Sequence, residues 1–170
     1  KEVGGSCGNI KVANRDENYL TKSISAMFWS SFNINRKATT TAGYMAVMSG
    51  ALSSYRKEDL LKLEDEYINQ EFLGSKCSIS DDRFLTQRIQ TRFNKKICYQ
   101  EKALCYTYVP SKLSKAWKMI ERWKRGALRE TLLLWKEPFN KTKLMMFDNQ
   151  FILLITISNL FCKFFLLTYL

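Results

Sequence analysis

Short apolar or alternating runs along the chain predict strands, and apolar residues three or four positions apart predict helices. Strands are expected at residues 3–12, 44–48, 52–55, 96–99 and 103–108. Helices are expected at residues 18–36, 57–72 (one helix or two), 81–92 and 113–135. Gly74 is expected to end the helical segment 57–72, and Ser78 or Ser80 to cap the next helix. Because strands and helices alternate, the fold class indicated is α/β.

A long apolar segment follows the last of these helices. Residues 151–170 include one charged residue, Lys163, and a helix of this length spans about 30 Å, the thickness of a bilayer core. The alternative is a buried core helix, but apolar side chains all around a helix suit lipid better than a protein core. We therefore expect a transmembrane helix at residues 151–170, complete or truncated, and interpret the chain as a piece of a longer membrane protein.

Positive charge is concentrated next to this apolar segment. The 170 residues carry 27 Lys+Arg and 16 Asp+Glu, a net charge of +11, and residues 111–143 hold ten of the basic residues and three of the acidic ones. The apolar stripe of the helix expected there includes three tryptophans and consists of Leu113, Trp117, Ile120, Trp123, Leu128, Leu132 and Trp135. A basic amphipathic helix with tryptophans suits an interface with anionic lipid, and excess Lys and Arg beside a membrane helix marks the cytoplasmic side.

The basic stretch also fits two alternative roles. It could be the solvated face of a core helix, and basic residues interleaved with aromatic ones also suit nucleic acid. The adjacent membrane segment accounts for the charge more economically. The partner expected is therefore a lipid bilayer and not nucleic acid.

Composition excludes several classes of catalysis. The chain has no His, which removes Ser-His-Asp and Cys-His catalysis and His-ligated zinc. The chain has five cysteines, an odd number, and no two of them have C-x-x-C spacing. Neither a disulfide framework nor a zinc ribbon is therefore expected. Buried free thiols in a reducing compartment are expected instead.

Three short segments could carry chemistry. Asp81 and Asp82 stand where a helix is expected to start, so they either complement the helix dipole or supply a general base. Arg122 and Trp123 offer a fork of donors for a phosphate and a flat face for a sugar ring. Small residues in the segment 49–56 would let a ligand approach the backbone.

In order and spacing, these segments resemble the processive family 2 glycosyltransferases, which are membrane-embedded synthases of hyaluronan, chitin and nodulation chitooligosaccharides. The resemblance covers about residues 2–170. The motifs that carry it are Gly4-Gly5-Ser6-Cys7-Gly8-Asn9, SGALSSYR from Ser49, Asn69-Gln70-Glu71-Phe72-Leu73-Gly74, Ser80-Asp81-Asp82-Arg83-Phe84-Leu85-Thr86-Gln87-Arg88, and Met119-Ile120-Glu121-Arg122-Trp123.

The chain departs from the family pattern at single positions of these motifs. Asn9 stands in place of an acidic residue, and Ala51 and Ser53 stand in place of a Pro and a Gly. Ser80 replaces a Gly or Glu, and Met119 replaces a Gln that in the family helps to hold the acceptor and pyrophosphate region.

The resemblance implies the C-terminal half of a GT-A-like nucleotide-sugar domain. The expected boundaries are 1–110 for this partial catalytic domain, 111–148 for an amphipathic interface helix region and 151–170 for the transmembrane helix. The family's D-x-D site for Mg²⁺ or Mn²⁺ would lie upstream of residue 1, so the chain alone is expected to be inactive. The location implied is the cell membrane, with the catalytic part on the cytoplasmic side.

The reaction implied by the resemblance is inverting transfer of a sugar from a UDP-sugar donor to a growing polysaccharide acceptor. Asp82 would be the general base, Arg122 would contact the leaving diphosphate, and Trp123 would stack on the acceptor sugar. The other substrate-binding residues implied are Ser49, Gly50, Asp81 and Arg83. The alternatives are a non-catalytic membrane-associated remnant or pseudoenzyme, and a basic nucleic-acid-binding module.

Overall fold

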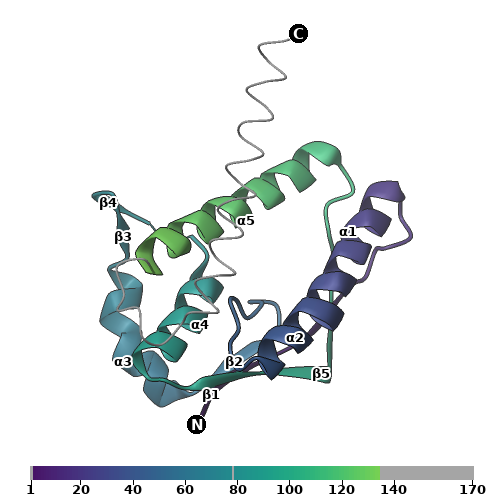
Figure 1. Ribbon diagram of the computed structural model, residues 1–170. Helices are drawn as coiled ribbons and strands as arrows, with labels where there is room; N and C mark the ends of the chain where they lie inside the picture. Colours follow the sequence, from purple (N-terminus) through teal and green to yellow (C-terminus); the bar gives the residue numbers. More distant parts are fainter. Residues whose placement is uncertain (1, 78, 135–170) are drawn as a thin grey trace.

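The computed structural model describes residues 2–77 and 79–134 (Figure 1). Its strands are β1 (Val3–Val12), β2 (Ser53–Tyr55), β3 (Glu71–Phe72), β4 (Ser75–Lys76) and β5 (Lys96–Thr107). Its helices are α1 (Tyr19–Ser30), the π-helical segment η1 (Ser31–Asn35), α2 (Arg36–Thr41), α3 (Lys57–Ile68), α4 (Asp81–Arg92) and α5 (Leu113–Leu134). The mixture of strands and helices confirms the α/β class.

The transmembrane helix expected at residues 151–170 lies outside the described residues, as do residues 135–148 of the expected interface region. Within the described ranges, no helix is both long enough and apolar enough to cross a bilayer. The expected domain boundaries therefore stay predictions.

The main sheet has three strands in the order β2-β1-β5, with β1 parallel to β5 and antiparallel to β2. Two glycines let other elements lie directly on β1. A Cβ on Gly4 would collide with Ile89 of α4, and one on Gly8 would collide with Leu52 in the segment before β2. The glycine-rich start of β1 thus brings α4 and the segment before β2 close to the same strand.

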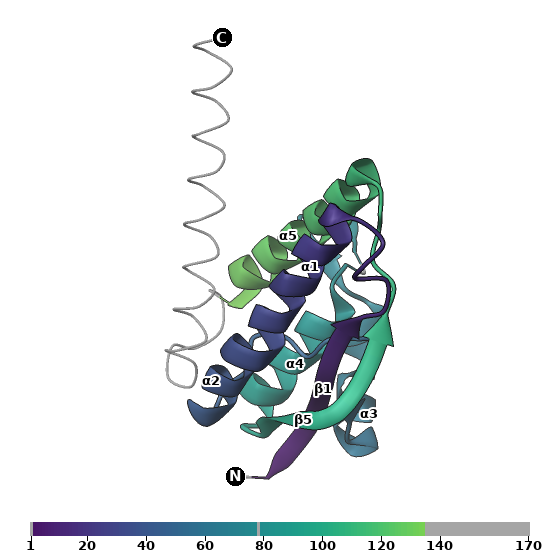
Figure 2. The same cartoon turned by 90° about the vertical axis from the view of Figure 1, so that its right-hand side faces the viewer.

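Helices α1, α4 and α5 lie on the same side of the paired strands β1 and β5 (Figure 2). A buried cluster between the sheet and α4 consists of Cys7, Met45, Met48, Leu63, Ile89 and Ile97. A second cluster, which joins the end of β1 to α1 and α5, consists of Val12, Ile24, Val109 and Ala116. Packing of these two clusters fixes the three helices relative to β1.

Residues 44–48 do not form the strand that their sequence predicts. Side chains of α4 bond their backbone instead: the Gln90 amide accepts from Met45 N–H at 2.8 Å and donates to the Met45 carbonyl at 2.6 Å. Thr86 Oγ1 accepts from Met48 N–H at 2.9 Å. Because these side chains satisfy the backbone groups, the apolar residues are buried without a neighbouring strand. Residues 53–55 do form a strand, β2.

The helix expected to run to residue 72 ends at Ile68, so the prediction that Gly74 ends it is wrong. Gly74 lies in the turn of the β3–β4 hairpin. Leu73 and Gly74 have φ values of +52° and +78°, and two consecutive positive φ angles are what a tight hairpin turn requires.

The two strands expected at residues 96–99 and 103–108 form a single strand, β5. Gly8 pairs with Gln100 and the next residue, Asn9, pairs with Leu104. Residues 101–103 are therefore an irregularity within one strand, which the sequence pattern shows as a break.

Helix α4 begins and ends where the sequence predicts. Ser80 occupies its N-cap position, but no side-chain hydrogen bond caps the helix there, and Ser78 lies outside the described residues.

The buried face of α5 differs from the predicted apolar stripe. Leu113 and Trp117, both in that stripe, are 72% and 56% exposed. The buried side of α5 is made of small and polar residues together with one leucine: Ala116, Gly126, Ala127, Arg129, Glu130, Thr131 and Leu134. Small side chains allow α5 to approach α4 closely, and Leu113 and Trp117 lie outside that interface.

Candidate functional site

The Asp82 carboxylate lies in the first turn of α4 and is held by groups from two segments. Its Oδ1 accepts from Arg83 N–H at 2.8 Å and from the Ser80 hydroxyl at 3.4 Å, and its Oδ2 accepts from Gly50 N–H at 3.4 Å. These contacts connect the start of α4 to the small-residue turn before β2. The carboxylate is half-buried and fixed in orientation, and its remaining lone pairs can accept a proton or a hydrogen bond.

Asp82 lines a cavity of about 370 Å³. Ser49 and Gly50, from the turn before β2, line the same cavity, as do Arg122 and Trp123 from α5. A neighbouring cavity of about 290 Å³ shares Ser49, Asp82 and Trp123 with it and is also lined by Arg83. The fold therefore brings together six of the seven residues that the sequence singles out.

Asp81, the seventh, is not among the residues that line these two cavities. Burial raises the pKa of the Tyr67 phenol in α3, and the Asp81 carboxylate raises that pKa further. Asp81 Oδ1 is buried and has no hydrogen-bond partner among the described residues. The two adjacent carboxylates thus have different surroundings, one facing α3 and one facing the cavity.

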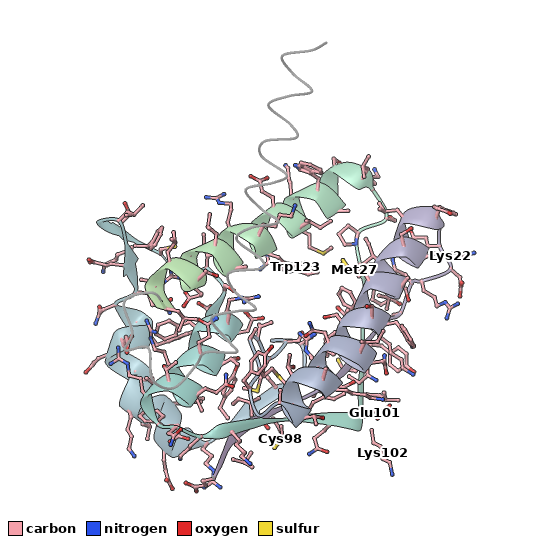
Figure 3. The ribbon with its side chains drawn as sticks, viewed as in Figure 1. Lys22, Met27, Cys98, Glu101, Lys102 and Trp123 are labelled. Carbon is pink, nitrogen blue, oxygen red and sulfur yellow. The ribbon has the colours of Figure 1, made fainter. Side chains whose placement is uncertain are left out.

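Aromatic and thioether side chains form the walls of the site. The ring of Trp123 lies 6.0 Å from that of Phe28 in α1, with 41° between the ring planes. Figure 3 shows Trp123 of α5 and Met27 of α1 reaching into the space between the two helices. Met119 lines the larger cavity where the family has a Gln, and it packs against the cluster that contains Val12. A thioether cannot donate the hydrogen bonds of an amide, so this wall is less polar than the family pattern predicts.

Arg36, at the start of α2, is a residue of the site that the sequence analysis missed. It is buried and lines the smaller cavity. Its guanidinium lies 3.9 Å from the centroid of the Phe32 ring and donates to Ser31 Oγ at 2.6 Å. Burial lowers the pKa of Arg36, while the nearby Cys7 and Asp82 act in the opposite direction.

A signal for Arg36 exists in the sequence. Phe28, Phe32 and Arg36 are spaced four residues apart, which places them on one face of a continuous helical segment. An arginine in line with two aromatic residues on one helix face indicates a cation that packs against their rings, as Arg36 does on Phe32.

Asn9, another departure from the family pattern, is buried in β1, and its Nδ2 lies 3.5 Å from Asn33 Oδ1. The described cysteines Cys7, Cys77, Cys98 and Cys105 are free thiols as expected, but of these four only Cys7 is buried and the other three are partly exposed. Within residues 2–77 and 79–134, no three Cys, Asp or Glu side chains lie together in a group that could hold a metal ion.

Comparison with known proteins agrees with the motifs. The sequence model of the family described as "Glycosyl transferase family group 2" matches residues 1–170. Human hyaluronan synthase 3 is 32% identical over 147 residues, which are 85% of this chain and 26% of the human protein. Hyaluronan synthase 2 of Xenopus laevis is 33% identical over 146 residues, again 85% of this chain and 26% of the relative.

The chain thus spans about a quarter of the length of these curated relatives. The family match over the whole chain confirms the resemblance that the five motifs indicate. This chain belongs to glycosyl transferase family group 2.

Proposed function

We propose that the protein containing this chain is a membrane-bound glycosyltransferase that transfers a sugar from a UDP-sugar to a growing polysaccharide of the hyaluronan or chitin type. The observation that carries the proposal is the meeting of three motifs, from residues 49–56, 80–88 and 119–123, around one cavity. The family match and the similarity to proteins named hyaluronan synthases support the reaction class and the kind of polymer.

In the proposed reaction, Asp82 takes the proton from the acceptor hydroxyl. The acceptor oxygen attacks the anomeric carbon while the bond from that carbon to the diphosphate oxygen breaks, and UDP leaves. A direct displacement of this kind inverts the configuration at the anomeric carbon. The orientation of Asp82 by Gly50 and Arg83 N–H groups supports this role, because a general base must be held within hydrogen-bond reach of its proton.

The other residues of the cavity bind substrate in this proposal. Arg122 contacts the leaving diphosphate, for which a guanidinium offers a fork of donors. Trp123, opposite Phe28, stacks on the terminal sugar of the acceptor. Ser49 and Gly50 line the pocket where the backbone can approach a ligand, and Arg83 adds positive charge beside it.

Asp81 is proposed to orient its neighbour or to complement the start of α4, because it faces α3 and not the cavity. Mg²⁺ or Mn²⁺ is proposed to be held by residues outside residues 1–170.

The membrane location and the cytoplasmic position of the site are also part of the proposal. The exposed Leu113 and Trp117 on α5, in a stretch rich in Lys and Arg, support contact with a lipid interface. The apolar segment at residues 151–170 supports an anchor in the bilayer.

The test is incorporation of radiolabelled sugar into polymer by membranes that contain the full-length protein, with UDP-N-acetylglucosamine and UDP-glucuronic acid supplied separately and together. Sensitivity of the product to hyaluronidase or to chitinase identifies the polymer. No incorporation above membranes without the protein, for any donor combination, would contradict the proposal.

A pseudoenzyme is the second candidate, and Met119 in the cavity wall favours it. If the wild-type protein is inactive and Met119→Gln gains transfer, the loss of the amide accounts for the inactivity. Activity of the wild-type protein excludes this candidate.

A further inference from the structure

The side chain of Arg129 on α5 is hydrogen-bonded to the segment that leads into α4. Arg129 is 4% exposed. Its Nη1 donates to the carbonyl of Ile79 at 2.9 Å, and its Nη2 donates to Gln70 Oε1 at 2.8 Å. Ile79 directly precedes Ser80, so this contact lies three residues before Asp82.

The same helix also lines the cavity, through Arg122 and Trp123 among others. Arg122, Gly126 and Arg129 are spaced four and three residues apart, which places them on one face of α5. Arg122 lines the cavity, and Gly126 lies against Ser80. From Arg122 to Arg129 the helix rises about 10 Å at 1.5 Å per residue. Helix α5 therefore carries Arg122, the proposed diphosphate contact, at one point. At another point it holds residues 79–82, the Asp82 segment.

Arg129 has a buried acidic neighbour, Glu130. Arg129 Nη1 lies 3.5 Å from Glu130 Oε1, and the Glu130 side chain is completely buried. Neither carboxylate oxygen of Glu130 has a hydrogen-bond partner among the described residues. A buried ion pair of this kind is weak evidence for a stabilising role, and positioning of a neighbouring segment is the alternative.

We propose that Arg129 is a positioning residue, which fixes Asp82 relative to Arg122 and Trp123 and affects turnover through Asp82. The role rests on the proposed function. A guanidinium is suited to it because its planar fork can bond two acceptors at once, here a backbone carbonyl and the Gln70 amide.

The first test is Arg129→Lys in the full-length protein. Lysine keeps the positive charge beside Glu130, but its single nitrogen cannot reproduce the two-armed contact with Ile79 and Gln70. We expect kcat to fall by roughly 10- to 100-fold, as misplacement of a catalytic group by about 1 Å does, while KM for the donor stays within about twofold. Arg125→Lys, at an exposed arginine of the same helix, is the matched control and leaves both constants unchanged.

The second test separates positioning from a general loss of folded protein. Arg129→Lys is combined with Asp82→Asn, and the residual rate is measured for each variant at equal amounts of donor-binding protein. If Arg129 acts through Asp82, the lysine substitution lowers the rate of the wild type but not that of the Asp82→Asn protein.

The role of Arg129 would be overturned by an unchanged kcat in Arg129→Lys. It would also be overturned if the lysine substitution lowered kcat by the same factor in the wild type and in Asp82→Asn. Either result would leave the proposed function standing. A wild-type protein that transfers no sugar from any donor would overturn the proposed function and this role with it.

Discussion

The side chain of Ser80 occupies the space that a side chain at residue 126 would need. A Cβ on Gly126 would lie 2.5 Å from Ser80 Cβ and 2.9 Å from Ser80 Oγ. Ser80 itself has a φ of +69°, in the left-handed region that favours glycine. The absence of a side chain at Gly126 thus makes room for the serine, and it lets α5 approach the Asp82 segment.

This contact predicts that Gly126→Ala lowers turnover and stability, because the added methyl group pushes Ser80 and the start of α4 away from α5. Overpacking of this kind typically costs about 1–3 kcal/mol. Ser80→Gly should be tolerated, and it should restore most of the loss in the double variant. Thermal unfolding and kcat of the four proteins measure this coupling. The same loss from Gly126→Ala in the presence and absence of Ser80→Gly would show that the two residues act independently.

The sequence predicts those features of the site that depend on one helix alone. Asp82 was placed at a helix start and Arg122 with Trp123 on an amphipathic helix, and both placements hold in the structure. That their segments share a cavity came from the family resemblance, since local spacing does not report contacts over about forty residues.

Other features could not be predicted because long-range contacts determine them. The apolar residues 44–48 have the pattern of a strand, but Gln90 and Thr86 satisfy their backbone. The burial of Arg129 and Glu130 on α5 is equally invisible in a pattern that assigns polar residues to solvent. Conversely, the same pattern assigns Leu113 and Trp117 to a buried side, and both are exposed in the structure.

The Glu130 carboxyl should make stability depend on pH. Burial raises its pKa above the ordinary 4.5, although Arg129, Arg88 and Arg83 act in the opposite direction. A raised pKa means that the folded state binds the proton more tightly than the unfolded state, so stability falls as pH rises from about 4.5 through the raised value. Glu130→Gln should remove this part of the dependence. Unfolding midpoints between pH 4.5 and 7.5 test it, with the exposed Glu121→Gln as control. Parallel curves for wild type and Glu130→Gln would contradict it.

The N-terminal half of α5 should bind anionic lipid. Each Lys or Arg near such a surface contributes about 1 kcal/mol to the free energy of binding, and salt weakens this contribution by screening the charges. A peptide of residues 111–134 should therefore partition to anionic vesicles much more than to neutral ones at low salt. Trp117→Ala should lower partition to both, because it removes an exposed apolar ring. Equal binding of the peptide to anionic and neutral vesicles at low salt would exclude the interface role.

Trp123→Ala should weaken use of the acceptor more than binding of the donor. It removes the ring that faces Phe28 and leaves Arg122 in place. Aromatic contacts contribute about 0.5–1.5 kcal/mol beyond the area they bury, so KM for an added acceptor oligosaccharide should rise by roughly 3- to 10-fold. Trp117→Ala, on the exposed side of the same helix, serves as control. A larger change in donor affinity than in acceptor KM would reverse the assignment.

The most direct measurement of the central claim compares turnover of Asp82→Asn and Asp81→Asn in the full-length protein, together with donor affinity. Asparagine is almost isosteric with aspartate but cannot take up the proton, so Asp82→Asn should lower kcat by roughly 10²- to 10⁴-fold with donor affinity within a few-fold. Asp81→Asn should cost much less, because Asp81 faces Tyr67 and not the cavity. Wild-type turnover in Asp82→Asn, or a greater loss in Asp81→Asn, would contradict Asp82 as the base and leave both carboxylates as the start of a helix.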